Sequence, residues 1–367
     1  ITLDRLDISH GCMGVFMAQS TGLSNTISRA LLCNSVIRDM DDSGYYLSQW
    51  PRWQPSGNED IRLISNTFLR IGFRPLINGT LAVNIANSIN QLLFRHNYIG
   101  FCAHNGMQIQ NGNPGIMLVE DNLFEWNCLC CTDAGGFKFH SSDARVFHKA
   151  LVKGNLSRYN YGWTYAAERV DMGYAWIPAA RKGMRGQGFY VDVTGGVCYY
   201  RNVAVENGGW GITYSKAHHS GTNYVYHNTL CRAAGAIEFG DPGTGELRAD
   251  TRIINNLYVN NIRNNTFISQ SQGDVFNNTA RTISALPGMQ VDYNAYRLLD
   301  MPPAAQYVFE FSHTGGQIQH QTVLAVRTNT PCEHHGLQTS TPMLLNEDGD
   351  ACADFTPLQS SPLCDMA

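Results

Sequence analysis

The chain has 367 residues, of which 43% are hydrophobic and 15% are charged, and its formal net charge is -4. A chain of this length can bury a large core, either as two domains or as one elongated domain. The low and slightly acidic charge leaves no basic surface for nucleic acid or for an anionic membrane, so we expect neither as a partner.

From the first residues onward, the chain repeats one form, in which apolar alternation stands on both sides of an asparagine. "ITLDRLDISHG" at residue 1 already has the pattern of such a strand, and "LLCNSVIRDM" supplies Asn34 as the expected first asparagine. The series continues, in steps mostly of 25 to 33 residues, at Asn66, Asn97, Asn122, Asn155, Asn202, Asn228 and Asn256. This period is typical of solenoid coils. An inward amide can satisfy the turn backbone of its own coil and of the next, so we interpret the series as a structural ladder.

A second series of five-residue segments lies between the asparagines: "GVFMA" at 14, "GYYLS" at 44, "GMQIQ" at 106, "GFKFH" at 136, "GFYVD" at 188, "GITYS" at 211 and "AIEFG" at 236. Their second and fourth residues are nearly all large and apolar, from Val15 and Met17 to Ile237 and Phe239. Strand side chains alternate between two faces, so these residues should point into a core and the third and fifth should point outward. The sequence therefore predicts an all-β, right-handed parallel β-helix.

We expect the coils to occupy residues 1–282. Beyond residue 283 the repeat fades, and residues 283–367 are predicted to form an irregular C-terminal appendage or cap packed on the helix. Solenoid ends must be covered to hide apolar faces and unpaired edges. Because the first residues already look like a coil strand, we expect a partner chain or a missing segment to cover the N-terminal coil.

Several segments resemble a known superfamily. "AGGFKFHSSD", "GFYVDVTGGVCYYRNVAVENGGWGI" and "YVYHNTL" look like coils of the pectate-lyase-like superfamily of β-helix proteins. The tail segments "VDYNAY" and "DFTPLQSSPLCDMA" resemble the ending of its secreted bacterial members. The resemblance implies a parallel β-helix and a secreted or extracellular protein. It does not select an activity, because this architecture carries lyases, hydrolases, epimerases, viral tailspikes, adhesins and structural filaments.

Ionisable side chains gather at the outward positions of the central coils. An aspartate before two glycines, such as Asp192, is by itself more often a turn former than a catalytic group. Its coincidence with other ionisable residues on neighbouring coils makes it a candidate. The predicted catalytic residues are Asp192, Glu238, His140, Lys138 and Tyr190.

The segment between Asn155 and Asn202 is about twenty residues longer than its neighbours, which is unusual enough to suggest function. Aromatic faces pack against sugars, and arginines bind carboxylates or hydroxyls. Packing of Trp163 and Trp176 onto the coil is an equal alternative. The predicted substrate-binding residues, in this segment and after the following coil, are Trp163, Trp176, Arg181, Arg185, Lys216 and His218.

The favoured function is a glycoside hydrolase that cleaves a polysaccharide or oligosaccharide. Asp192 and Glu238 would lie two coils apart, about 10 Å along the axis, which is compatible with the inverting geometry. β-Helix glycosidases of the β-xylosidase kind resemble this chain in placing an aspartate on a "G-x-x-x-D" coil, but they carry a glutamate on the next coil, where this chain has Ser215.

Two alternatives stay open. In a polysaccharide lyase acting on a uronic-acid polymer by β-elimination, Lys138, His140 or Tyr190 would move the proton and Arg181 or Arg185 would hold the acid group. The compact acidic calcium cluster of pectate lyases, and the Lys and Arg motifs of alginate and chondroitin lyases, are not found in the sequence. The other alternative is a non-catalytic extracellular structural or adhesive subunit.

The remaining signals concern cysteines, glycans and cofactors. Eleven cysteines lack the paired spacing of a zinc site, so some are expected in disulfides and some as buried thiols. Sequons at Asn78, Asn155, Asn264 and Asn277 suit a secreted glycoprotein. No cofactor is expected and no metal is assigned, with a structural calcium ion left as an open alternative. No apolar run approaches the roughly 18 residues of a membrane helix, and the first residues do not have the charged, apolar and small-residue zones of a signal peptide.

Overall fold

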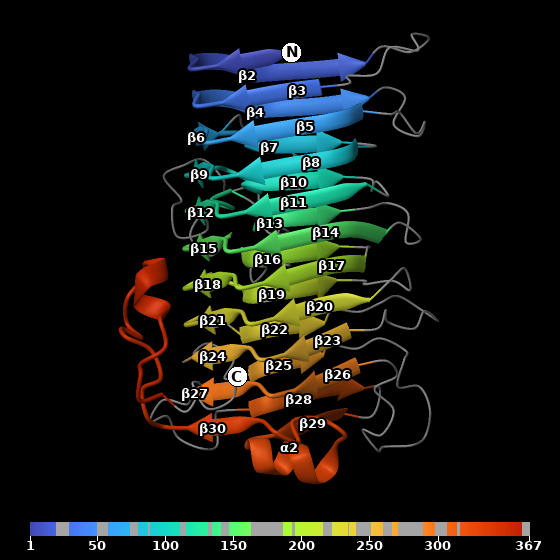
Figure 1. The fold of residues 1–367 in the computed structure, drawn as a ribbon, viewed down its shortest axis with the longest axis vertical. Helices are drawn as coiled ribbons and strands as arrows, with labels where there is room; N and C mark the ends of the chain where they lie inside the picture. The colour runs from blue at the N-terminus through green and yellow to red at the C-terminus, as the bar shows by residue number, and fades with distance from the viewer. Residues whose placement is uncertain are drawn as a thin grey trace.

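Short strands stack in register along one long axis and form a parallel β-helix (Figure 1), which confirms the predicted all-β solenoid. Within the described residues, no helix is both long enough and apolar enough to span a bilayer. The computed structural model describes residues 1–19, 29–49, 58–73, 80–86, 89–110, 115–130, 134–140, 147–162, 186–192, 195–215, 222–233, 235–239, 251–259, 266–270, 289–297, 307–313 and 316–361.

Each coil contributes to three parallel sheets, and the first sheet precedes the asparagines. Its neighbouring strands come from successive coils and pair in parallel without exception among the described strands. In spatial order the strands are β1 (Thr2–Asp4), β3 (Arg29–Cys33), β5 (Asn58–Ile64), β8 (Ile89–Arg95), β11 (Ile116–Glu120), β14 (Phe147–Lys153), β17 (Gly195–Tyr200), β20 (Asn223–Tyr226), β23 (Thr251–Ile254) and β26 (Met289–Asp292).

The second sheet follows the asparagines and is built mainly of very short strands. It begins with the first halves of the long strands β2 (Asp7–Gln19) and β4 (Val36–Gln49), which bend into the third sheet. Its other strands are β6 (Thr67–Ile71), β9 (Tyr98–Gly100), β12 (Leu123–Glu125), β15 (Leu156–Arg158), β18 (Val203–Val205), β21 (Thr229–Cys231), β24 (Leu257–Val259), β27 (Ala295–Arg297) and β30 (Leu337–Thr339).

The third sheet carries the predicted catalytic residues. After the second halves of β2 and β4 it contains β7 (Val83–Ala86), β10 (Met107–Gln110), β13 (Gly135–His140), β16 (Gln187–Asp192), β19 (Trp210–Ser215), β22 (Gly235–Phe239), β25 (Thr266–Gln270) and β28 (Tyr307–His313). One strand, β29 (Gly316–His320), closes this sheet antiparallel to β28. A helix, α2 (Val323–Asn329), and a 3-10 turn, η6 (Cys352–Phe355), follow later in the chain.

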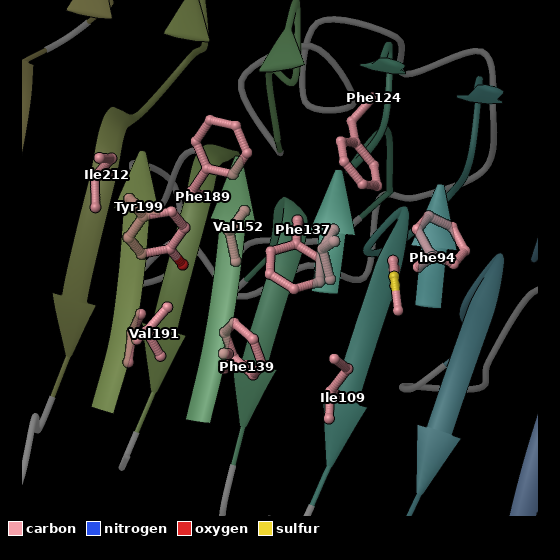
Figure 2. Close-up of a cluster of buried hydrophobic side chains, with 14 of the residues drawn as sticks. Phe94, Ile109, Phe124, Phe137, Phe139, Val152, Phe189, Val191, Tyr199 and Ile212 are labelled. Atoms are coloured by element: carbon pink, nitrogen blue, oxygen red, sulfur yellow. The ribbon is translucent and has the colours of Figure 1, made fainter. Parts of the chain in front are cut away.

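The register of the third sheet agrees with the alignment of the five-residue segments. Phe137 pairs with Phe189, and Phe189 pairs with Ile212. The inward residues are buried, and Figure 2 shows their side chains meeting those of the first and second sheets, such as Tyr199 and Phe124. The alignment missed one coil, β7, whose segment "AVNIA" at 82 fits the same five-residue pattern.

The glycine that begins most of these five-residue segments has a steric reason, as Gly188 shows. A Cβ atom added at Gly188 would lie 2.5 Å from the carbonyl oxygen of Gly211 on the next coil. That separation is far inside van der Waals contact, so the coils could not keep their spacing with a larger residue there. Glycine therefore recurs at this position because the backbones of neighbouring coils lie very close together there.

The asparagine ladder forms as predicted between the first and second sheets. In Asn122 the main-chain N–H and the side-chain Nδ2 both donate to Asn155 Oδ1, at 3.0 Å and 2.8 Å, while Nδ2 also donates to the carbonyl of Phe94 at 3.0 Å. The same pattern links Asn66 through to Asn294, which extends the series beyond Asn256. Each amide thus satisfies turn backbone that would otherwise be buried without a partner.

The prediction that Asn34 is the first member of the asparagine ladder is wrong. Ser35 holds the ladder position, since its main-chain N–H donates to Asn66 Oδ1 at 3.1 Å. Asn34 lies one residue earlier, in a left-handed turn with φ of 50°, and its side chain donates to Asp4 at the surface. Asparagine tolerates this backbone conformation better than most residues, which explains its place in the turn. Because it stands next to the ladder position, the sequence alignment assigned it to the ladder.

The other end of the ladder is a buried carboxylate that the sequence did not reveal. Asn294 donates from its main-chain N–H to Glu333 Oε2 at 3.3 Å and from Nδ2 to Oε1 at 2.7 Å, and the Tyr296 hydroxyl donates to Oε1 at 2.5 Å. Glu333 is fully buried. Burial raises the pKa of Glu333 to about 7, although the hydrogen bonds from Tyr296 and Asn294 lower it in part.

The Glu333→Gln variant is expected to remove a pH dependence from the stability of the fold. Folded Glu333 holds its proton up to about pH 7, whereas an unperturbed carboxyl titrates near 4.5. The native protein therefore loses stability as the pH rises through this window, by about 3 kcal/mol in total from this group. Denaturant unfolding should show a smaller fall between about pH 5 and about pH 8 in the variant than in the wild type. Equal falls would contradict this role for Glu333.

Parallel stacking continues beyond residue 283. β26, β27 and β28 pair with β23, β24 and β25 of the preceding coil. After the β28–β29 hairpin, helix α2 and β30, the C-terminal tail (residues 340–361) runs back along the second sheet, as the red segment of Figure 1 shows. Its Met343, Leu344 and Phe355 belong to one apolar cluster with residues of that sheet. The division into two units at residue 282 stays a prediction.

Two expectations about modification meet contrary findings. None of the following described cysteines is in a disulfide: Cys12, Cys33, Cys102, Cys128, Cys198, Cys231, Cys332 and Cys352. Several of these cysteines point into the core, where a thiol packs as a small apolar group.

The sequon at Asn155 is not a glycosylation site in this fold, because the Asn155 side chain is fully buried in the ladder and has no room for a glycan. The sequons at Asn78, Asn264 and Asn277 lie outside the described residues.

Candidate functional site

The candidate site lies on the outer face of the third sheet, at β13 and β16. In these neighbouring strands Lys138 pairs with Tyr190, and His140 pairs with Asp192. Paired residues of adjacent parallel strands lie about 4.8 Å apart, so the register alone brings the four side chains together. We call Lys138, His140, Tyr190 and Asp192 the central cluster.

Asp192 is the centre of the contacts within the central cluster. Its Oδ2 atom lies 2.9 Å from His140 Nδ1 and 3.2 Å from Lys138 Nζ. Lys138 Nζ in turn lies 4.3 Å from the centre of the Tyr190 ring, within cation–π range. One carboxylate oxygen therefore binds an ammonium and an imidazole, while the aromatic ring covers the ammonium.

Burial separates the roles of the four side chains. Only 5% of the Lys138 side chain and 10% of the Asp192 side chain are exposed, compared with 35% of the His140 side chain. Tyr190 is also buried. The outward positions of these coils are thus mostly covered, and the imidazole is the group of the central cluster most open to a bound molecule.

Asp192 is an ionised carboxylate in this setting. Burial has the largest single effect and raises the pKa of Asp192, but the hydrogen bond from His140 and the charge of Lys138 together outweigh it. The pKa of the carboxyl therefore lies below its usual value. A carboxylate held in this form accepts hydrogen bonds and has no proton to donate at neutral pH.

The His140–Asp192 contact fixes the chemistry of the imidazole. Since the carboxylate can only accept, Nδ1 carries the hydrogen and donates it to Asp192. In the neutral ring Nε2 then has a lone pair on the side away from Asp192. A base oriented by a buried carboxylate in this way is a recurring arrangement for proton transfer.

Glu238, the second predicted carboxylate, is placed apart from the central cluster. It stands two strands from Tyr190 in the same column of side chains, with Thr213 between them. The Thr213 hydroxyl donates to Glu238 Oε2 at 3.3 Å. Asp192 belongs to the adjacent column, which continues through Ser215. Asp192 and Glu238 thus lie on the same face of the sheet but contact different side chains: Asp192 contacts His140 and Lys138, and Glu238 contacts Thr213.

Amide side chains flank the central cluster on the preceding coil, of which Asn105 and Gln108 are buried, and the sequence alone gave them no role. Gln108 pairs with Lys138, and Gln110 pairs with His140. Asn105 donates from Nδ2 to Gln108 Oε1 at 2.7 Å and accepts the Gly135 N–H at 2.7 Å. Asn105 therefore holds both Gln108 and the start of the strand that carries Lys138. Gln108 was visible in the outward series, but nothing local linked Asn105 to it.

The predicted substrate-binding residues Trp163, Trp176, Arg181, Arg185, Lys216 and His218 lie outside the described residues, so their roles stay predictions. Within the described part of the chain, no three His, Cys, Asp or Glu side chains are grouped to hold a metal ion. In comparisons with protein-family models, curated proteins and solved structures, no match to this chain was found.

Proposed function

We propose that this protein is a carbohydrate-active enzyme that cleaves an acidic polysaccharide by β-elimination, with His140 as the base. The contact between His140 Nδ1 and the buried Asp192 carboxylate, 2.9 Å long, carries the proposal. It orients a partly exposed imidazole on the flat face of a long parallel sheet. An extended sheet face suits an extended polymer, and an oriented imidazole suits proton abstraction.

The proposed reaction needs one base and one acid. His140 Nε2 takes the proton from the carbon next to the uronate carboxylate, and the electron pair of that C–H bond forms a carbon–carbon double bond. The bond from the neighbouring ring carbon to the glycosidic oxygen breaks, and the departing oxygen receives a proton. The protonated His140 can return it, so no water is consumed and the charges balance. The acid group of the substrate also needs a cation, for which Arg181 and Arg185 remain the predicted candidates.

Elimination is favoured over hydrolysis by the state of Asp192. A hydrolase needs one carboxylic acid to protonate the leaving oxygen and a second carboxylate to act as base or nucleophile. Asp192 is buried, ionised and already accepts from two cations or donors. It is better suited to positioning His140 than to attacking a sugar. The resemblance to the pectate-lyase-like superfamily supports a secreted location and leaves the substrate class open.

Incubation of the full chain with a panel of neutral and uronic polysaccharides tests this function. We expect new reducing ends together with ultraviolet absorbance from unsaturated products, on an acidic polymer only. Reducing ends without that absorbance would replace elimination by hydrolysis. Neither signal on a broad panel would favour the structural or adhesive alternative and overturn the proposal.

A further inference from the structure

A cavity of about 520 Å³ lies between the β-helix and its C-terminal tail, and no residue of the central cluster lines it. The wall from the tail includes Phe355 and Thr356. The wall from the β-helix is a column of residues at the same turn position in four successive coils: Arg201, His227, Asn255 and Tyr293. We call these four residues the turn column.

The turn column points outward for a backbone reason. Each member immediately precedes a ladder asparagine, whose side chain is directed inward. Each member also has a left-handed backbone, with φ between 53° and 58°. Inward and outward side chains alternate at this corner, so four side chains from different coils form one strip along the helix axis.

The opposite wall is fixed in place by the tail contacts. Leu344 and Phe355 line the cavity and also belong to the apolar cluster on the second sheet. Arg297 Nε lies 3.1 Å from Glu347 Oε2, and Arg232 donates to the carbonyl of Gly349 at 2.5 Å. The cavity is therefore preformed, and its volume lies in the range of small-molecule binding sites.

The cavity has positive charge without an acidic partner. The Arg201 guanidinium lies 5.0 Å from the centre of the Tyr200 ring, and no carboxylate of the described residues forms an ion pair with it. Burial, and then the charge of Arg201, lower the pKa of His227. An anion bound between these two side chains would offset the charge of Arg201 and favour the protonated form of His227.

We propose that this cavity binds a carboxylated sugar of one or two residues, at a site separate from the central cluster. Arg201 can bind a carboxylate with two parallel hydrogen bonds. The Asn255 amide and the Thr356 hydroxyl can bind sugar hydroxyls, and the rings of Tyr293 and Phe355 provide apolar surface. The choice of a sugar among carboxylates rests on the proposed function, whereas the preference for an anion rests on the cavity itself.

Binding of galacturonate and galactose to the full chain tests the proposal, since the two differ only in the carboxylate and contain no glycosidic bond to cleave. NMR titration should show galacturonate binding with a rise in the pKa of His227, and at least about tenfold weaker binding of galactose. Arg201→Gln should weaken galacturonate binding by about tenfold to hundredfold. Arg5→Gln is the matched control, because Arg5 occupies the same left-handed turn position in the first coil.

Other outcomes would overturn the site. Unchanged galacturonate binding in Arg201→Gln, or no binding to the wild type, contradicts the proposal directly. Loss of binding in His140→Gln but not in Arg201→Gln would move the sugar to the central cluster, which supports the proposed function and removes this second site. Acetate binding as tightly as galacturonate would exclude a sugar site.

Discussion

His140→Gln is expected to lower the turnover number on the acidic polysaccharide by about 10²- to 10⁴-fold, which is the usual contribution of a positioned general base. The reason is geometric. Asp192 orients the imidazole through a 2.9 Å contact, and a glutamine amide has no basic nitrogen to take the proton. The effect should fall on kcat more than on KM, because the base acts in the transition state.

The matched control for this prediction is His96→Gln. His96 is half exposed at a turn, where it lies 3.6 Å from Asp121 and takes no part in the central cluster. Its replacement should leave kcat within about twofold of the wild type and the fold intact. A similar loss of kcat in both variants would show that the loss is not specific to His140. Retained turnover in His140→Gln would exclude His140 as the base.

Asp192 is less suitable for a first kinetic test. Removing its charge would take away the carboxylate that lies 3.2 Å from Lys138 Nζ, although only 5% of the Lys138 side chain is exposed. Breaking such a pair from one side typically costs about 3 to 5 kcal/mol in stability. A loss of activity in Asp192→Asn would therefore mix a changed fold with a changed base, whereas His140 is more exposed and separates the two effects.

Asn155→Ala is expected to destabilise the β-helix by at least about 3 kcal/mol. The substitution removes the acceptor for the N–H and Nδ2 groups of Asn122 and the donor to the Val119 carbonyl. All of these groups are buried, and each unsatisfied one costs about 1 to 3 kcal/mol. The fall in the free energy of unfolding can be read from denaturant titrations with the full chain.

Two further variants show whether the hydrogen bonds of Asn155 cause this loss. Asn155→Asp keeps an acceptor for Asn122 but loses the donor to the carbonyls of Val119 and Lys153, so it should also destabilise the fold. Asn329→Ala, on the exposed surface of α2, removes one amide with a single hydrogen bond and should change stability by less than about 0.5 kcal/mol. A small effect of Asn155→Ala would mean that the ladder contributes little beyond its backbone pairing.

The sequence by itself determined the coil and its register. Alternation of apolar residues in "GFKFH" and "GFYVD" depends only on strand geometry, so Phe137, Phe139, Phe189 and Val191 were assigned to the core, and all four are buried there. The same alignment placed His140 beside Asp192, although 52 residues separate them along the chain. Similar coils repeat one local rule, so a long-range pairing became visible in a local pattern.

Only the tertiary structure decided which outward side chains are covered and which contacts end the repeat. Lys138 and Tyr190 occupy outward positions yet are buried, because their surroundings come from several coils at once. Ser35 rather than Asn34 occupies the first ladder position because of the turn conformation there. Glu333 ends the ladder from a segment that lies far along the chain. The cavity beside Arg201 exists because the tail returns across the coils that carry the turn column, and no periodic pattern encodes where an irregular segment docks.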